Sequence, residues 1–106
     1  MKFIVGYFTA RPGQRDILLE KAAVQAAGTR AEPGCLYFEM VPLPDRPDDI
    51  LLAECFVDAE AHRLHGETPH QKWFQGELRK YASSVDIHII ADNDPQHVQR
   101  TFEPPA

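Results

Sequence analysis

Cysteine, positive charge and long hydrophobic runs are all scarce in this sequence of 106 residues. The two cysteines, Cys35 and Cys55, permit one disulfide and exclude a disulfide-stapled scaffold. They form neither a CxxC nor a Cys/His zinc spacing, so we expect two free thiols. Lys and Arg number 11 against 16 Asp and Glu, a formal charge of −5. This argues against nucleic-acid and anionic-membrane partners, because both need a positive protein surface.

No apolar run approaches the ~18 residues that a membrane-spanning helix needs. The first ten residues resemble the front of a signal peptide, but Arg11–Arg15 interrupts them before a cleavage site develops. We therefore expect a strand there and a cytoplasmic protein. With 43% hydrophobic and 25% charged residues, the composition is that of one small globular domain.

Hydrophobic periodicity and turn residues predict seven elements. In order they are a strand, a helix, two strands, a short helix, a longer helix and a strand, over residues 2–10, 14–30, 36–41, 50–57, 58–64, 68–82 and 85–91. The first strand is apolar on both faces, which indicates a central position. Asp58 and Thr68-Pro69 have the residue types that begin helices.

The order βαββαβ predicts an α+β, ferredoxin-like domain over residues 1–91 with an antiparallel sheet. The strands at 2–10 and 50–57 should lie in its centre, and those at 36–41 and 85–91 at its edges. Two helices can cover only one sheet face, so we expect the other to be covered by a second copy of the chain. Residues 92–106 are predicted to be a C-terminal tail that reaches across this partner, with Phe102 as its anchor.

Several segments carry a family resemblance that spans residues 2 to about 91. They are Arg11–Arg15, Ala31–Leu36, Phe38-Glu39, Leu52–Glu54, Phe56–Asp58, His65, and Pro69-His70 before Phe74. Together they resemble the antibiotic biosynthesis monooxygenase family of the dimeric α+β barrel superfamily. The resemblance implies a homodimeric barrel of two facing sheets, with a pocket between sheet and helices in each protomer. It also implies oxidation of phenolic or quinol substrates by molecular oxygen without metal or flavin, although some members degrade haem or isomerise phosphorylated metabolites.

Haem is not expected as a substrate, because three positions depart from the haem-degrading members. Those members carry an asparagine, a tryptophan and a histidine where this chain has Gly6, His65 and Gln75.

His65 and His70 are the predicted catalytic residues. Oxidation of a phenol without a cofactor requires its hydroxyl to lose a proton, and a neutral imidazole can accept one near neutral pH. With His62 and Glu67 the same pair resembles a metal cluster. Gly66 and Pro69 break the helix between these candidates, so we expect no metal and no cofactor.

Aromatic side chains are predicted to line the substrate pocket. They are Tyr7, Phe8, Tyr37, Trp73 and Phe74. Glu39 and Glu54 lie in neighbouring predicted strands and would be nearly opposite in a symmetric hairpin. Two interpretations stay open: an acid–base pair, or two carboxylates bound by arginine or backbone groups at a dimer interface or sheet edge.

The sequence thus predicts a cofactor-independent monooxygenase that acts on a phenolic or quinol-like small aromatic. The alternatives are an isomerase or lyase of a small polar metabolite, and a non-catalytic ligand-binding dimer.

Overall fold

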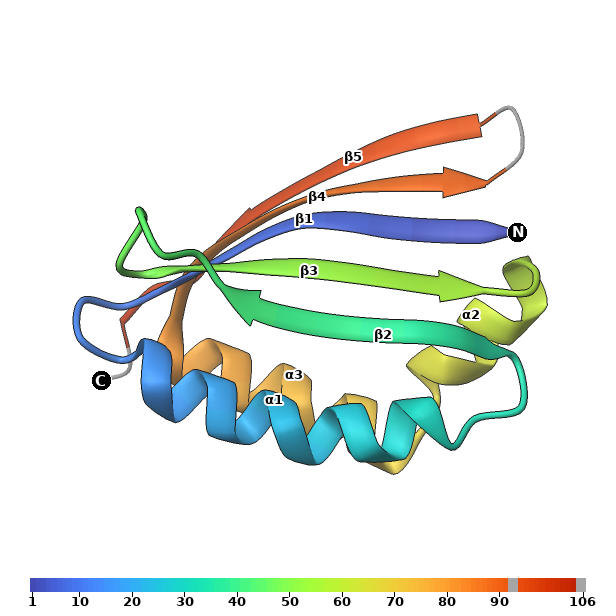
Figure 1. Ribbon diagram of the computed structural model, residues 1–106, viewed down its shortest axis with the longest axis horizontal. Coiled ribbons are helices and arrows are strands. Elements are labelled where there is room, and N and C mark those ends of the chain that lie inside the picture. The colour runs from blue at the N-terminus through green and yellow to red at the C-terminus, as the bar shows by residue number, and fades with distance from the viewer. Residues whose placement is uncertain (92–93, 105–106) are drawn as a thin grey trace.

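Five antiparallel strands and three helices form the part of the chain that the computed structural model describes, residues 1–91 and 94–104 (Figure 1). The fold is the expected ferredoxin-like α+β fold. The elements are β1 (Lys2–Ala10), α1 (Arg15–Arg30), β2 (Cys35–Pro42), β3 (Asp49–Phe56), α2 (Ala59–Gly66), α3 (Pro69–Tyr81), β4 (Ala82–Ala91) and β5 (Asp94–Thr101). Along the sheet the strands run β2-β3-β1-β4-β5. The predicted central position of the first and third strands is confirmed.

Both predicted helix starts are present. The Asp58 side chain accepts a hydrogen bond from the Ala61 N–H at 2.8 Å at the beginning of α2. At the beginning of α3, Thr68 accepts from the Gln71 N–H at 3.3 Å, and Pro69 occupies the first turn. These caps fix where α2 and α3 begin, and the Thr68 cap lies between the two predicted histidines.

The core lies between one face of the sheet and the helices α1 and α3, which lie on the same side of the sheet (Figure 1). Alternation along β1 places Ile4 and Phe8 on the covered face, where both are buried. Phe3, Val5 and Tyr7 point to the other face and are 36–38% exposed. The expectation of an apolar face that the helices do not cover is therefore confirmed.

The fifth strand corrects the predicted edge and the predicted tail. Residues 94–101 pair antiparallel with β4, from Ser84 opposite Thr101 to Ala91 opposite Asp94, so β4 is an inner strand of the sheet. This segment is polar apart from Val98, and its extended form depends on pairing with β4. Phe102, the expected anchor on a partner chain, packs instead against the core of its own chain. Asp92, where the tail was predicted to begin, lies outside the described residues.

Cys35 and Cys55 are free, as predicted. No helix within the described ranges is both long and apolar enough to cross a membrane.

Candidate functional site

A cavity of about 130 Å³ lies on the helix side of the sheet. Its wall combines apolar side chains of β1, β3, β4, β5 and α3 with five polar side chains. The apolar ones are Ile4, Phe8, Leu52, Leu78, Val85, Ile87, Ile89 and Val98, and the polar ones are Glu54, His62, Gln71, Gln75 and Arg100. An apolar cavity of ~150 Å³ holds a benzene ring. The space is therefore of the size of one aromatic ring, and it lies where the family resemblance implied a pocket.

Glu54 is the carboxylate of this cavity. It projects from β3 between Ile4 on β1 and Phe38 on β2, and only 7% of it is exposed. Burial raises the pKa of Glu54 to about 8, and the negative charge of Glu32 raises it further. Glu54 also lines a second, smaller cavity beside Phe38 and Phe74. It therefore titrates close to physiological pH inside the cavity.

Glu39 does not face Glu54, so the predicted opposed pair is wrong. The loop between β2 and β3 sets a register in which Glu54 lies opposite Phe38 and Glu39 lies opposite Ala53. A shift of one residue moves a side chain to the other face of a sheet. Glu39 is exposed and pairs with Arg30 at 3.1 Å, in agreement with the second interpretation for this residue.

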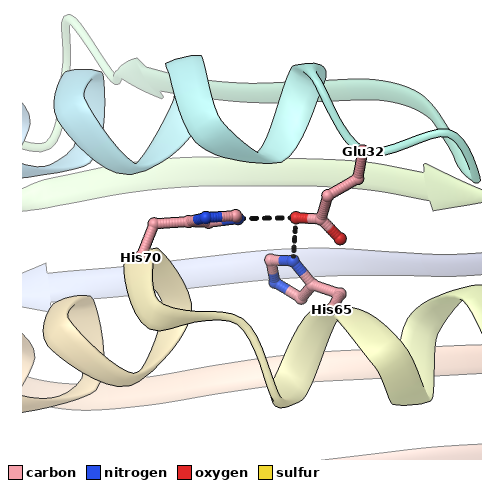
Figure 2. Close-up of side chains that lie close together, drawn as sticks. All are labelled: Glu32, His65 and His70. Atoms are coloured by element: carbon pink, nitrogen blue, oxygen red, sulfur yellow. Dashed lines mark hydrogen bonds and ion pairs between the residues drawn. The ribbon is translucent and has the colours of Figure 1, made fainter.

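The predicted histidines are brought together by Glu32, from the turn between α1 and β2 (Figure 2). One carboxylate oxygen of Glu32, Oε2, lies 2.8 Å from Nδ1 of His65 and 2.6 Å from Nε2 of His70. A carboxylate can only accept, so both ring nitrogens donate. His65 is 2% exposed, and among the described residues its Nε2 has no hydrogen-bond partner. A neutral His65 is thus held in the tautomer that leaves Nε2 as a free acceptor.

His62 lies between the cavity and this cluster. Its ring lines the cavity and stacks 6.3 Å from the His65 ring, at an interplanar angle of 18°. Burial lowers the pKa of His62 to about 4, and the positive charge of Lys2 acts in the same direction. Near neutral pH the cavity therefore contains a neutral imidazole.

The four residues that resemble a metal cluster in the sequence, His62, His65, His70 and Glu67, do not come together. Glu67 pairs with Arg63 at 2.8 Å, and Glu32 takes its place beside the two histidines. Glu32 lies more than thirty residues from either histidine in the sequence, so no local spacing pattern links them.

Of the five predicted aromatic lining residues, the structure brings Phe8 and Phe74 to the cavities. Their rings lie 6.3 Å apart, and both line the smaller cavity. Tyr7 and Tyr37 lie on the uncovered sheet face, where the Arg46 guanidinium sits 4.2 Å above the Tyr7 ring. Trp73 is 39% exposed on α3 and does not contribute to the lining of either cavity. Each of these three side chains adjoins, in sequence, a buried phenylalanine that points inward.

Arg100 is the cavity residue that sequence reasoning missed. It projects from β5, the segment predicted to be a tail, and supplies the cation among the lining side chains. Gln71 also lines both cavities and was not singled out. The signal available in the sequence was the alternation of Val98 and Arg100, two residues apart, which places both on one face of a strand.

Comparison with known proteins decides the family. The family model of the antibiotic biosynthesis monooxygenases matches residues 1–77. The chain belongs to this family. No curated protein sequence matches the chain.

Solved structures share the antibiotic biosynthesis monooxygenase fold. Rv0793 from Mycobacterium tuberculosis is 22% identical with a TM-score of 0.78, over 88% of this chain and 95% of its own. PA3566 from Pseudomonas aeruginosa is 23% identical with a TM-score of 0.77, over 92% of each chain. A Chloroflexus aurantiacus protein named as a candidate antibiotic biosynthesis monooxygenase is 26% identical with a TM-score of 0.75, over 88% of this chain and 93% of its own.

Proposed function

We propose that this member of the antibiotic biosynthesis monooxygenase family oxidises a small phenol or quinol with molecular oxygen, without a bound cofactor. The observation that carries the proposal is Glu54, a carboxylate whose pKa burial raises to about 8, in a cavity of about 130 Å³. A base whose pKa lies near the working pH is the one best matched to proton abstraction.

The reaction begins when the Glu54 carboxylate accepts the hydroxyl proton of a substrate that occupies the cavity. The resulting phenolate is electron-rich and gives electrons to dioxygen. One oxygen atom then becomes a carbonyl of the quinone product. The other leaves as water, with the hydroxyl proton that Glu54 returns and one hydrogen from the ring carbon that is oxidised. The substrate supplies all the electrons, so dioxygen is the only co-reactant.

Arg100 favours the anion at this step. A guanidinium in the lining stabilises the negative charge of a phenolate. Phe8 offers a flat surface against which an aromatic ring can pack.

His65 and His70 enter this proposal as positioning residues. They are not among the side chains that line the cavities, but both bind the carboxylate of Glu32. The charge of Glu32 adds to the effect of burial on the pKa of Glu54. By holding that charge in place, the two histidines keep Glu54 a sufficiently strong base.

We further propose that the chain acts as a homodimer in the cytoplasm. Free cysteines suit a reducing compartment, and the apolar sheet face suits a second copy.

Oxygen uptake with a panel of phenols and quinols between pH 6 and 9 tests the reaction. Uptake by the unmodified chain should rise with pH around a midpoint near 8, as Glu54 ionises. Glu54→Gln should lower the rate by about 100-fold or more. Glu39→Gln is the matched control, because it removes a glutamate of the neighbouring strand that lies outside the cavity, and should leave the rate unchanged.

Two results would overturn the proposal: no substrate-dependent uptake by folded protein, or an unchanged rate in folded Glu54→Gln. The isomerase, the lyase and the non-catalytic dimer all predict the first of these results.

A further inference from the structure

The cluster of Glu32, His65 and His70 has a second chemical capacity that the proposed reaction does not use. Its three donor atoms come from the α1–β2 turn, from the last turn of α2 and from the first turn of α3. They are Oε2, Nδ1 and Nε2, and they lie within 4.8 Å of one another (Figure 2). The fold thus directs one carboxylate and two imidazoles toward one point.

This donor set is one that zinc-class cations use. Zinc binds imidazole nitrogen at about 2.0–2.1 Å and carboxylate oxygen at about 2.0–2.2 Å, which puts tetrahedral ligand atoms about 3.4 Å apart. The oxygen–nitrogen separations here are 2.6 and 2.8 Å. The two separations would therefore have to widen by roughly 0.6–0.8 Å to admit an ion.

The surroundings support a site with rigid ligands and one open side. His65 is 2% exposed and Glu32 14%, so both are fixed by packing, whereas His70 is 23% exposed and leaves a path from solvent. Gly28 packs directly against the His70 ring, since a Cβ built there would lie 2.7 Å from Cγ and Nδ1 of that ring. Two histidines and one glutamate with a fourth position left to water is an arrangement found in catalytic zinc sites.

We propose that Glu32, His65 and His70 bind one divalent zinc-class cation. The ion takes the place of the two ring protons that now point at Glu32, and each neutral imidazole then carries its proton on its other nitrogen. This inference goes beyond the proposed oxidation and does not depend on it, because binding is measured directly.

The test is a titration of the full chain, freed of metal with EDTA. Zn²⁺ is followed by calorimetry, and Co²⁺ by the visible absorption that tetrahedral ligation produces. We expect one equivalent to bind to the unmodified chain. Glu32→Gln should weaken binding at least tenfold, because it removes the anionic ligand. Gly28→Ala keeps all three ligands but displaces the His70 ring, and it should also weaken binding at least tenfold.

Two controls separate this cluster from other groups. Glu67→Gln removes an exposed carboxylate next to α2 and should leave the affinity unchanged. The double variant His88→Asn with His97→Asn removes the stacked imidazoles of β4 and β5, and should also leave it unchanged.

The proposal is overturned if the folded, unmodified chain binds no equivalent, which needs no variant to fold. It is equally overturned if binding survives in Gly28→Ala and Glu32→Gln but disappears in the double histidine variant. If the unmodified chain binds the metal but oxidises no phenol or quinol, the proposed function is wrong and the metal site stands.

Discussion

Glu54, which is buried, and His62, which is half-buried, have pKa values that shift in opposite directions, so the free energy of unfolding should depend on pH. Glu54 ionises at about 8 in the folded chain and at 4.5 ordinarily. Between these values the folded state holds a proton that the unfolded state has lost, so the free energy of unfolding falls as pH rises. His62 ionises at about 4 instead of 6.5, so its contribution rises with pH between these values.

The contributions of Glu54 and His62 to the free energy of unfolding oppose each other up to about pH 6.5. Between about pH 6.5 and 8 only the Glu54 contribution should change, so the free energy of unfolding should fall. One pKa unit corresponds to about 1.36 kcal/mol, so this fall should amount to about 2 kcal/mol. Urea denaturation at intervals between pH 5 and 9 measures it. In Glu54→Gln the fall above pH 6.5 should disappear, whereas in Glu39→Gln it should persist. A flat profile of the unmodified chain over pH 6.5–8 would contradict the burial of an ionisable Glu54.

At the residue scale, the sequence indicated which side chains have the right chemistry, but not which side chains they contact. His65 and His70 were identified from their chemistry and lie together, because Thr68 in the turn between them caps α3 and donates to the His65 carbonyl oxygen. Glu32 was not identified, because its hydrogen bonds to the two histidines form only when elements distant in the sequence pack together. Tyr7 and Tyr37 were placed on the wrong face because aromatic character alone does not reveal which face of a strand a helix covers.

Among the elements, the contact between β1 and β4 depends on the glycine in the middle of β1. A Cβ built on Gly6 would lie 2.2 Å from the Asp86 carbonyl oxygen and 2.6 Å from the Ile87 Cα, both of them backbone atoms. Backbone atoms within a sheet cannot move aside without breaking the strand pairing.

Gly6→Ala should therefore lower the free energy of unfolding by about 2 kcal/mol or more, as expected of overpacking. Gly76→Ala is the control, because a Cβ on this glycine of α3 meets nothing within 4 Å. It should be neutral or stabilise by about 0.5–1 kcal/mol. Thermal denaturation compares them. Equal stabilities of Gly6→Ala and Gly76→Ala would contradict the prediction, because they would show that β1 and β4 can move apart at little cost.

Arg11 connects β5 to the rest of the molecule. Its guanidinium donates to the carbonyl oxygens of Arg79 and Lys80 at the end of α3, and of Phe102 and Glu103 after β5. Arg11→Met should release the end of β5 and speed amide hydrogen exchange over residues 94–102, with a stability loss of about 1–3 kcal/mol. In Arg79→Met the four bonds persist, since Arg79 takes part through its backbone, and the exchange of β5 should be unchanged. If amide exchange over residues 94–102 stays slow in Arg11→Met, pairing with β4 alone is enough to hold β5 in place.

The order of the elements was predictable because caps, turns and hydrophobic periods are local signals. β5 was not predictable, because its polar sequence carries little strand propensity and its partner strand determines its form. The error extended to the site, since Arg100 was assigned to a tail that could contribute nothing to a cavity.

For the molecule as a whole, the uncovered sheet face predicts a homodimer. Large apolar side chains of β1, β2 and β4 on this face are 36–42% exposed: Phe3, Val5, Tyr7, Tyr37, Val41 and Ile90. Monomers rarely leave a continuous apolar patch of several hundred Å² in water. Sedimentation at low micromolar concentration should therefore show twice the chain mass of 12.0 kDa.

Val5→Asp should shift the sedimenting species toward the monomer, because it puts a charge in the middle of the face that a second copy would bury. Val24→Asp is the control, since Val24 is 60% exposed on α1 and away from that face. A 12.0 kDa species in the unmodified chain would contradict the dimer.

The place of β1 in the sheet has a consequence for synthesis on the ribosome. Lys2 pairs with Phe56 on one side and with Ala91 on the other, so the first strand to be made lies between two strands that are made much later. At about 5–20 residues per second, its second neighbour is complete only after roughly 5–20 seconds. During that interval a strand that is apolar on both faces lacks a partner on at least one edge. The nascent chain is thus a natural client for chaperones that bind short apolar segments, and the demand should end when β4 has been translated.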